Sequence, residues 1–266
     1  MKKILALFLI LTMVLALAAC GGGAGGDDAI VIASPADLEA EGVRIGVQNG
    51  TTGHTFANDN FADAEVMVYD SNVDVIQALL VGDVDAVILD ESPAASFVAR
   101  NEGRIKQLDE RLTHEYYGIS LALGSPYTAL FDATLDQLRA DGTLDRLIDY
   151  WVNENADAGR YESPADIAHP NGTLVMGTSA DFPPFEFFEG DQIVGLDPDI
   201  ARAIGDILGY EIEIMDMDFG SIILSVQGGQ VDFGMAGMTV TEERLEQVDF
   251  TQGYFLSGQS IIVRVQ

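Results

Sequence analysis

The sequence is poor in basic residues and has a single cysteine. Its 266 residues include 43 Asp and Glu but only 13 Lys and Arg, which gives a formal charge of −30. A chain of this charge is not expected to bind nucleic acid, because phosphate binding needs a surplus of basic side chains. One cysteine permits neither an intrachain disulfide nor a cysteine-based zinc site. The three histidines, His54, His114 and His169, share no metal-ligand spacing, so we expect no metal and no cofactor.

The cysteine stands at the end of an apolar leader. Two lysines at positions 2 and 3 precede an apolar run over residues 4–19, and Cys20 and several glycines follow. This order of charged, apolar and small residues is typical of a secretory signal peptide. The segment Leu17-Ala18-Ala19-Cys20 resembles the lipobox of bacterial lipoproteins, which implies a signal peptide over 1–19, lipidation of Cys20 and a Gly-rich tether over 20–28. The alternative is an incidental cysteine in an uncleaved anchor.

After the tether, short β-branched runs alternate with amphipathic stretches, which is typical of βαβ units and mostly parallel sheets. A first series predicts strands at Val43–Gln48, Glu65–Tyr69, Asp85–Asp90 and Ile105–Leu108, with helices at Asp74–Val81 and at Ser92–Asn101, the latter capped by Ser92. A second predicts strands at Leu174–Thr178, Glu211–Asp216, Val231–Ala236 and Ser260–Val265, with helices at Asp197–Leu208, Phe219–Gln227 and Thr241–Gln247. Between the two series, we expect a strand at Tyr116–Gly124 and helices at Ala129–Asp141 and Thr143–Asn153.

A weak internal repeat links the two series. Residues 81–90 align with residues 228–237 at an offset of 147, each as a helix end, a Gly turn, a Val-Asp pair and a buried strand. Any α/β protein could contain such a sequence pattern, so the repeat alone is weak evidence that the two series form similar sheets. It is informative because Asp90 and Gly237 stand at equivalent strand ends, and open α/β sheets bind ligands at the carboxyl ends of their strands.

Several longer motifs resemble the type II periplasmic solute-binding proteins of the polar amino-acid family (family 3). They are MAGMTVTEER at 235–244 followed by VDFT at 248–251, GTSADFPPFEF at 177–187, GLDPD at 195–199, GVQNGTTG at 46–53 and ADGT at 140–143. The resemblance implies a two-lobed periplasmic-binding-protein-like α/β fold, with a doubly wound, mostly parallel sheet in each lobe. We expect lobe 2 at 29–113 and lobe 1 at 114–266, with a connecting loop at 154–172.

The order of these motifs differs from the usual order in that family, in which the segment near Leu174 comes first. The sequence therefore predicts a circular permutation, in which residues 154–172 join the former ends. Such a change is tolerated where the former termini lie close together at the surface. We also expect the permuted chain to keep only one of the two usual crossings between lobes, near His114–Gly118.

The resemblance implies a set of residues that hold the ends of an amino acid. Arg244 would bind the carboxylate through its planar guanidinium fork, assisted by Thr52 from the Gly50–Gly53 turn. Asp90 would accept from the ammonium group. The backbone N–H of Thr239 and the carbonyl of Gly237 would also face the ligand, with the Thr239 hydroxyl as an extra partner. Each has a structural alternative: Arg244 could lie on a solvated helix face, Asp90 could cap the next helix, and Thr52 could serve the turn alone.

Three further residues would surround the ligand's side chain. Phe182 and Phe219 match positions where aromatic rings flank the ligand, although such residues more often belong to the core. Ser179 stands where receptors for basic amino acids often carry an acid, which favours a polar uncharged ligand, although Asp181, Glu186 and Asp218 lie close in sequence.

The resemblance implies a binding protein rather than an enzyme. We expect a lipid-anchored monomer at the extracellular or periplasmic face of the cell membrane, which binds a free polar amino acid and delivers it to the permease of an ABC importer. One alternative is a cyclohexadienyl dehydratase on the same scaffold, with Glu91 or Glu186 as the acid. Another is a ligand-sensing module.

Overall fold

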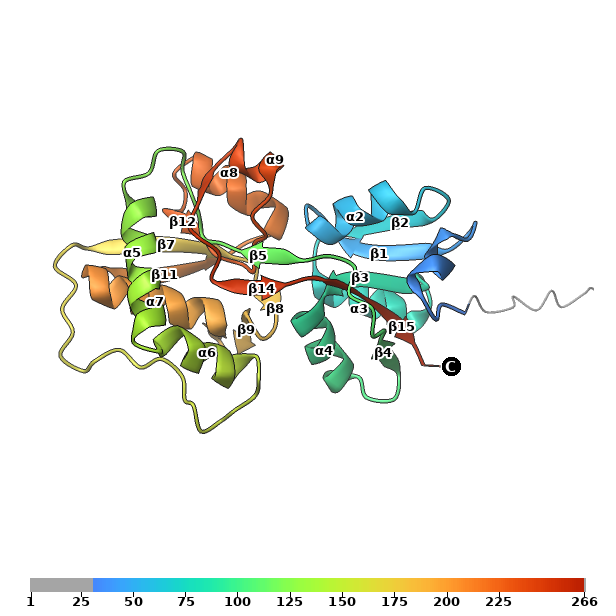
Figure 1. Cartoon of the computed structure of the whole chain (residues 1–266), viewed down its shortest axis with the longest axis horizontal. Helices are drawn as coiled ribbons and strands as arrows, with labels where there is room; N and C mark the ends of the chain where they lie inside the picture. The colour runs from blue at the N-terminus through green and yellow to red at the C-terminus, as the bar shows by residue number, and fades with distance from the viewer. Residues whose placement is uncertain (1–30, 266) are drawn as a thin grey trace, which may run out of the picture. The chain divides into compact units, whose positions relative to one another are not determined.

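The computed structural model describes residues 31–265, in which two five-stranded sheets form two lobes (Figure 1). The expected signal peptide, the tether and Cys20 lie outside the described residues. Lobe 2 contains the sheet with the first strands of the chain, and lobe 1 contains the other sheet.

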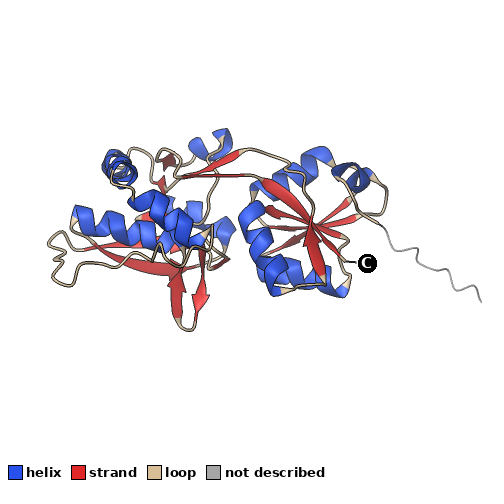
Figure 2. Ribbon diagram, turned by 60° about the horizontal axis from the view of Figure 1, so that its bottom comes forward, coloured by secondary structure: helices blue, strands red, loops and turns tan. Residues whose placement is uncertain are grey.

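The sheet of lobe 2 has the order β2-β1-β3-β15-β4. Its strands are β1 (Arg44–Gln48), β2 (Glu65–Tyr69), β3 (Ala86–Asp90), β4 (Ile105–Gln107) and β15 (Gln259–Arg264). Helices lie on both faces of the sheet (Figure 2), namely α2 (Thr52–Asn60), α3 (Asn72–Val81) and α4 (Glu91–Arg100), after a short η1 (Pro35–Glu39). β3 is buried along its whole length, as expected for a central strand covered on both faces.

The sheet of lobe 1 has the order β11-β7-β12-β6-β13. Its strands are β6 (Ser120–Leu121), β7 (Thr173–Thr178), β11 (Glu211–Asp216), β12 (Phe233–Gly234) and β13 (Asp249–Phe250). The helices of this lobe are α5 (Tyr127–Ala140), α6 (Thr143–Trp151), α7 (Leu196–Leu208), α8 (Ile222–Gln227) after η2 (Phe219–Ser221), and α9 (Glu242–Leu245). A small antiparallel sheet of β8 (Asp181–Phe182), β9 (Glu186–Glu189) and β10 (Gln192–Val194) lies between β7 and α7 in the chain.

The two large sheets share one topology. Counted across each sheet, the first three strands are parallel to one another. The fourth strand is antiparallel to the third, and the fifth is antiparallel to the fourth. β3 and β12 are the third strands of the two sheets, and they are the strands that the 147-residue repeat aligns. The repeat therefore marks a true structural correspondence.

The expected lobe boundary is wrong for the last strand. β15 pairs with β3 and β4 in lobe 2, whereas the whole of 114–266 was expected in lobe 1. Both crossings are consequently kept: β5 (Glu115–Tyr117) leads into lobe 1 and β14 (Phe255–Ser257) leads back, and the two strands pair antiparallel. The expectation of a single crossing is also wrong. The apolar run of β15 indicates burial, but it carries no information about which sheet the strand joins.

Two local features also differ from expectation. The helix α2 was not predicted, because its sequence TGHTFANDN is rich in weak helix formers; it forms because buried Gly53 and Ala57 allow it to pack on β1 and β3. The helix expected to start after Ser92 begins at Glu91. Pro93 is then the third helical residue, where its missing N–H would have no intrahelical partner in any case.

The connecting segment 154–172 has no regular secondary structure, as expected. It is attached to α7 at two acidic side chains. Asp199 accepts hydrogen bonds from the indole of Trp151 and the backbone N–H of Tyr161, and Asp206 accepts one from the Tyr161 hydroxyl and contacts His169. The segment therefore follows the surface of lobe 1.

Candidate functional site

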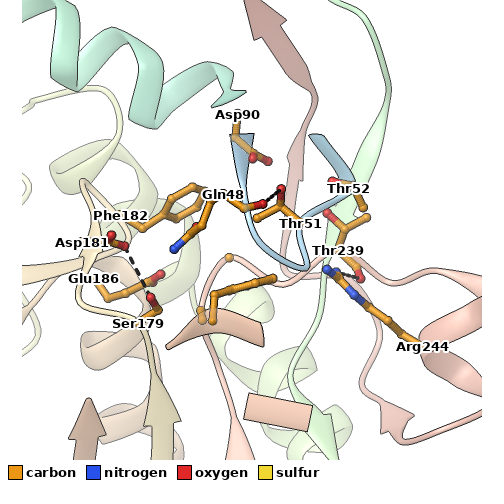
Figure 3. Close-up of a pocket in the computed structure, with 13 residues that line it drawn as sticks. Gln48, Thr51, Thr52, Asp90, Ser179, Asp181, Phe182, Glu186, Thr239 and Arg244 are labelled. Atoms are coloured by element: carbon orange, nitrogen blue, oxygen red, sulfur yellow. Dashed lines mark hydrogen bonds between the residues drawn. The ribbon is translucent and has the colours of Figure 1, made fainter. Parts of the chain in front are cut away.

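One pocket between the lobes contains all eight residues that the sequence pointed to. The expected residues that line it are Thr52, Asp90, Ser179, Phe182, Phe219, Gly237, Thr239 and Arg244, and Gln48, Thr51, Asp181, Glu186 and Ala236 line it as well (Figure 3). Most of these residues lie at or just after the carboxyl ends of strands, where open α/β sheets bind ligands.

Arg244 is buried at one end of the pocket, with 8% of its surface exposed. It lies in the short helix α9, whose first turn is capped by the Thr241 side chain. Its guanidinium donates to the carbonyl oxygens of Thr239 at 2.7 Å and of Gly50, in the other lobe, at 3.0 Å, and lies 5.4 Å from the ring centre of Phe219. None of the ion pairs within residues 31–265 involves this side chain. The alternative of a solvated helix face is thus excluded, and the charge lacks a carboxylate partner within that range.

Thr52 is the first residue of α2 rather than part of a free turn. The N-cap is Thr51, whose hydroxyl oxygen accepts from the N–H of His54. The N–H groups of the first helical turn have no partners within the helix, and the dipole of the helix adds positive potential there. α2 therefore presents donors to the same pocket as Arg244, from the opposite lobe.

Asp90 ends β3 and is buried, with 6% of its surface exposed. It occupies the cap position of α4, but its side chain makes no capping hydrogen bond, so the capping alternative is wrong. Its carboxylate instead accepts a 2.5 Å hydrogen bond from the hydroxyl of Tyr117 on β5. Burial, reinforced by the nearby charge of Glu115, raises the pKa of Asp90 to about 7.

Gly237 follows β12 and has a positive φ of 52°. A side chain at this position would collide with the ring of Phe182, since an added Cβ would lie 2.5 Å from it. The N–H of Gly237 donates to Asp197 at 2.8 Å, which leaves its carbonyl as the group available to a ligand. Asp197 is fully buried, accepts from the hydroxyl of Tyr254 as well, and has its pKa raised to about 6 by burial.

Two acids that were not among the expected site residues line the other end of the pocket. Asp181 follows β7 and accepts hydrogen bonds at 2.6 Å and 3.3 Å from the backbone and side chain of Asn72, in lobe 2. Glu186 is fully buried beside the carboxyl of Asp197, and apart from this neighbouring acid no group among residues 31–265 donates to its carboxyl oxygens. Burial raises the pKa values of both acids, and the charge of Asp197 adds to the effect at Glu186. Buried polar groups are seldom left unpaired.

Sequence reasoning also missed Gln48, which ends β1 and accepts from Asn72 at 2.8 Å. The rule that ligands bind at the carboxyl ends of strands could have identified it, because β1 was predicted with its correct end.

The dehydratase alternative named Glu91 as an acid of the cleft, but this residue pairs with Arg111 and does not line the pocket. Within residues 31–265 no group of three or more His, Cys, Asp or Glu could hold a metal ion.

The two aromatic residues expected at the site, Phe182 and Phe219, differ in their contacts. Phe182 lines the pocket but also packs on Tyr117 and Phe185 in the core, whereas Phe219 is half-buried and faces Arg244. Ser179 is buried and lies 3.4 Å from Asp181.

In the described part of the chain, no helix has the length and hydropathy needed to cross a membrane.

Comparison with known proteins gives one family. Residues 174–266 match the bacterial extracellular solute-binding proteins of family 3. The arginine-binding extracellular protein ArtP of Bacillus subtilis is 51% identical over 89 residues, which are 34% of this chain and 35% of ArtP. The glutamine-binding protein of Geobacillus stearothermophilus is 36% identical over 98 residues, 35% of this chain and 37% of the relative. The chain thus spans about a third of the length of the curated relatives it matches, and both relatives are named as binding proteins, not enzymes.

Solved structures give matches of similar extent. An ancestral arginine-binding protein bound to arginine is 50% identical, with a TM-score of 0.31, over 32% of this chain and 38% of that chain. The arginine-bound form of domain 1 from TmArgBP, in its Phe57Trp mutant, is 42% identical, with a TM-score of 0.32, over 35% of this chain and 79% of that chain.

Proposed function

We propose that this chain, whose residues 174–266 match the bacterial extracellular solute-binding proteins of family 3, binds a free α-amino acid in the pocket between its lobes and delivers it to an ABC importer. The observation that carries this proposal is the state of Arg244. A buried guanidinium without a carboxylate partner is costly. The carboxylate of an amino acid would supply that partner in a bidentate geometry. The amino end of α2 would supply further donors from the other lobe.

The opposite charge of the ligand has acceptors nearby. An ammonium group placed between Asp90, the Gly237 carbonyl and the Thr239 hydroxyl would meet one ionisable and two neutral acceptors. A cation near Asp90 favours its ionised form, so binding should release a proton near neutral pH. These contacts come from both lobes, and therefore the ligand stabilises the closed arrangement.

We propose that the ligand has a cationic side chain, in contrast to the uncharged one expected from Ser179. Three carboxyl groups line the pocket, those of Asp90, Asp181 and Glu186, against one guanidinium. If Asp90 receives the α-ammonium, Asp181 and Glu186 remain for the side chain. A guanidinium or ammonium group beside Asp181 and Glu186 would donate hydrogen bonds to their carboxyl oxygens and favour the ionised forms of both acids. The relative ArtP, which is 51% identical over 89 residues and is named for arginine, supports this choice.

A thermal-shift screen of the twenty amino acids tests the proposal, since a ligand that binds only the folded state raises the melting temperature. We expect the largest shift with L-arginine or L-lysine. L-citrulline serves as the matched neutral control, because it has nearly the shape of arginine. A screen in which no amino acid shifts the melting temperature would refute amino-acid binding. Equal shifts with arginine and citrulline would refute only the cationic preference.

We further propose that the chain is a circular permutant of the family's usual order. Two features support this: the match to the family begins at residue 174, and Ile32 and Val263, near the two ends of the described chain, belong to one apolar cluster in lobe 2. A re-ordered chain that starts at residue 172, continues from 266 into 27 and ends at 154 should fold and bind the same amino acid with a similar affinity. A re-ordered chain that does not fold would contradict the permutation.

The lipid anchor and the oligomeric state are proposals as well. We propose that Cys20 is lipidated and holds the protein at the outer face of the cytoplasmic membrane, which we expect to show as incorporation of an alkyne-labelled fatty acid that is lost in Cys20→Ser. Equal labelling of the variant would contradict it. We propose a monomer, because a single chain supplies every residue that lines the pocket, and light scattering of the purified protein tests this.

A further inference from the structure

The crossing strand β5 has two buried side chains that contact residues lining the pocket. Glu115 and Tyr117 are buried, at 7% and 0% exposure, and Tyr116 between them is 59% exposed. This alternation is that of a strand with one face buried. Tyr117 donates to Asp90. Glu115 does not line the pocket itself, but it binds two residues that do.

Both of these residues are threonines, and they lie in different lobes. The hydroxyls of Thr52, at the start of α2 in lobe 2, and of Thr239, in lobe 1, donate to the same carboxylate oxygen of Glu115 at 2.8 Å and 2.6 Å. Thr113 donates to the other oxygen at 2.6 Å, and the side-chain amide of Gln259 approaches the first at 3.4 Å. One carboxylate on a crossing strand thus connects the two walls of the pocket.

The direction of these hydrogen bonds follows from the chemistry of the groups. An ionised carboxylate only accepts, and a threonine hydroxyl has one proton to donate. Because Thr52 and Thr239 give their protons to Glu115, only lone pairs of their hydroxyl oxygens remain for the pocket. Thr52 already accepts from Gln259 at 3.2 Å. Thr239 has no other hydroxyl contact within residues 31–265, and its oxygen is therefore available as an acceptor.

We propose that Glu115 is a positioning residue that fixes the Thr239 hydroxyl as a hydrogen-bond acceptor toward the ligand and links Thr52 and Thr239 across the closed lobes. The inference rests on the proposed function, and it specifies one end of the ligand: the group beside Thr239 must be a donor, as an ammonium is and a carboxylate is not. Removal of the carboxylate would release both threonine protons. The closed arrangement would then lose a contact that both lobes share.

The ligand-free protein provides the first test. Spin labels at Val81 in lobe 2 and Leu123 in lobe 1, both exposed, in a Cys20→Ser background report the distance between lobes by pulsed electron paramagnetic resonance. We expect Glu115→Leu, which removes both acceptor oxygens, to shift the distribution to longer distances. Glu110→Leu, at an exposed position nearby, removes the same groups and should leave it unchanged. An unchanged distribution in Glu115→Leu would overturn the link between the lobes.

Calorimetry with two probes provides the second test. L-arginine carries the α-ammonium, and 5-guanidinopentanoate is the same molecule without it. Opening of the lobes would weaken the binding of both probes by the same factor, so 5-guanidinopentanoate serves as the reference. We expect Glu115→Leu to weaken L-arginine binding about tenfold more than 5-guanidinopentanoate binding, the effect of one charge-assisted hydrogen bond. A purely structural role would weaken both probes equally, and that result would overturn the inference.

A double-mutant cycle separates the charge of Glu115 from its action through the threonine. Thr239→Val should weaken L-arginine binding in the wild-type protein but add little in the Glu115→Leu background, in which position 115 has no acceptor. Additive effects would overturn the assigned path. A wild-type protein that does not bind L-arginine would refute the cationic ligand instead, and the distance measurement would still decide on Glu115.

Discussion

Arg244→Ala should separate ligand binding from folding. In the proposed complex the guanidinium makes two parallel hydrogen bonds to the ligand's carboxylate. Each charge-assisted bond contributes about 1.5–3 kcal/mol, so their loss amounts to about 3–6 kcal/mol, or about a hundred- to ten-thousandfold in Kd. Little screening by water reduces this value, because the side chain is only 8% exposed. The variant also leaves the ligand's carboxylate in a pocket lined by acids.

The unliganded protein should tolerate this substitution. The variant loses two hydrogen bonds to backbone carbonyls, about 1 kcal/mol each, but it also removes a buried charge that has no carboxylate partner within residues 31–265. These terms oppose each other, and about 1 kcal/mol moves the melting temperature of a domain this size by only about 2–4 °C.

Calorimetry with L-arginine and a thermal melt of the unliganded variant measure the two quantities. Arg244→Lys is the matched control, since it keeps the charge but not the planar fork, and its affinity should lie between those of wild type and Arg244→Ala. If Arg244→Ala binds L-arginine within threefold of wild type, the guanidinium does not hold the carboxylate. A large fall in melting temperature would show that the side chain is mainly structural.

Three further predictions concern the buried acids. Affinity for L-arginine should fall as the pH drops below about 7, where Asp90 gains a proton. Tyr117→Phe removes a donor that favours the ionised form of Asp90, so it should move the midpoint of this pH dependence to higher pH. An unmoved midpoint would contradict the role of Tyr117. Asp90 loses its proton near pH 3.8 when unfolded but near 7 when folded, so between these values the unfolded chain binds fewer protons and the free energy of unfolding falls as pH rises. The melting temperature of the unliganded protein should thus be higher at pH 5 than at pH 8, with a smaller difference in Asp90→Asn, and an equal difference would show that Asp90 is not responsible. Asp181→Asn replaces an acceptor of the Asn72 N–H and removes a carboxyl group from the pocket. Calorimetry should therefore show weaker binding of L-arginine and little change in the binding of L-citrulline. Equal losses of affinity for the two ligands would contradict a charge-specific role.

The sequence by itself determined the fold class and much of the pocket. Strand and helix periodicity depends on neighbouring residues, so β1, β2, β3 and β11 could be predicted nearly to the residue. Six of the eight expected site residues lie in contiguous motifs at or near strand ends, such as 235–244, and the fold brings all eight together because the two sheets share one topology.

Tertiary structure alone decided the features that depend on distant partners. No local pattern shows that β15 joins the sheet of lobe 2, because its partners β3 and β4 lie more than a hundred residues earlier in the chain. The same holds for α2, which forms through packing rather than propensity. Glu115 was not predicted as a functional residue, because its contact with Thr239 spans 124 residues. A glutamate at the start of a strand is common in sequence, and only the folded arrangement of the two lobes shows which hydroxyls it binds.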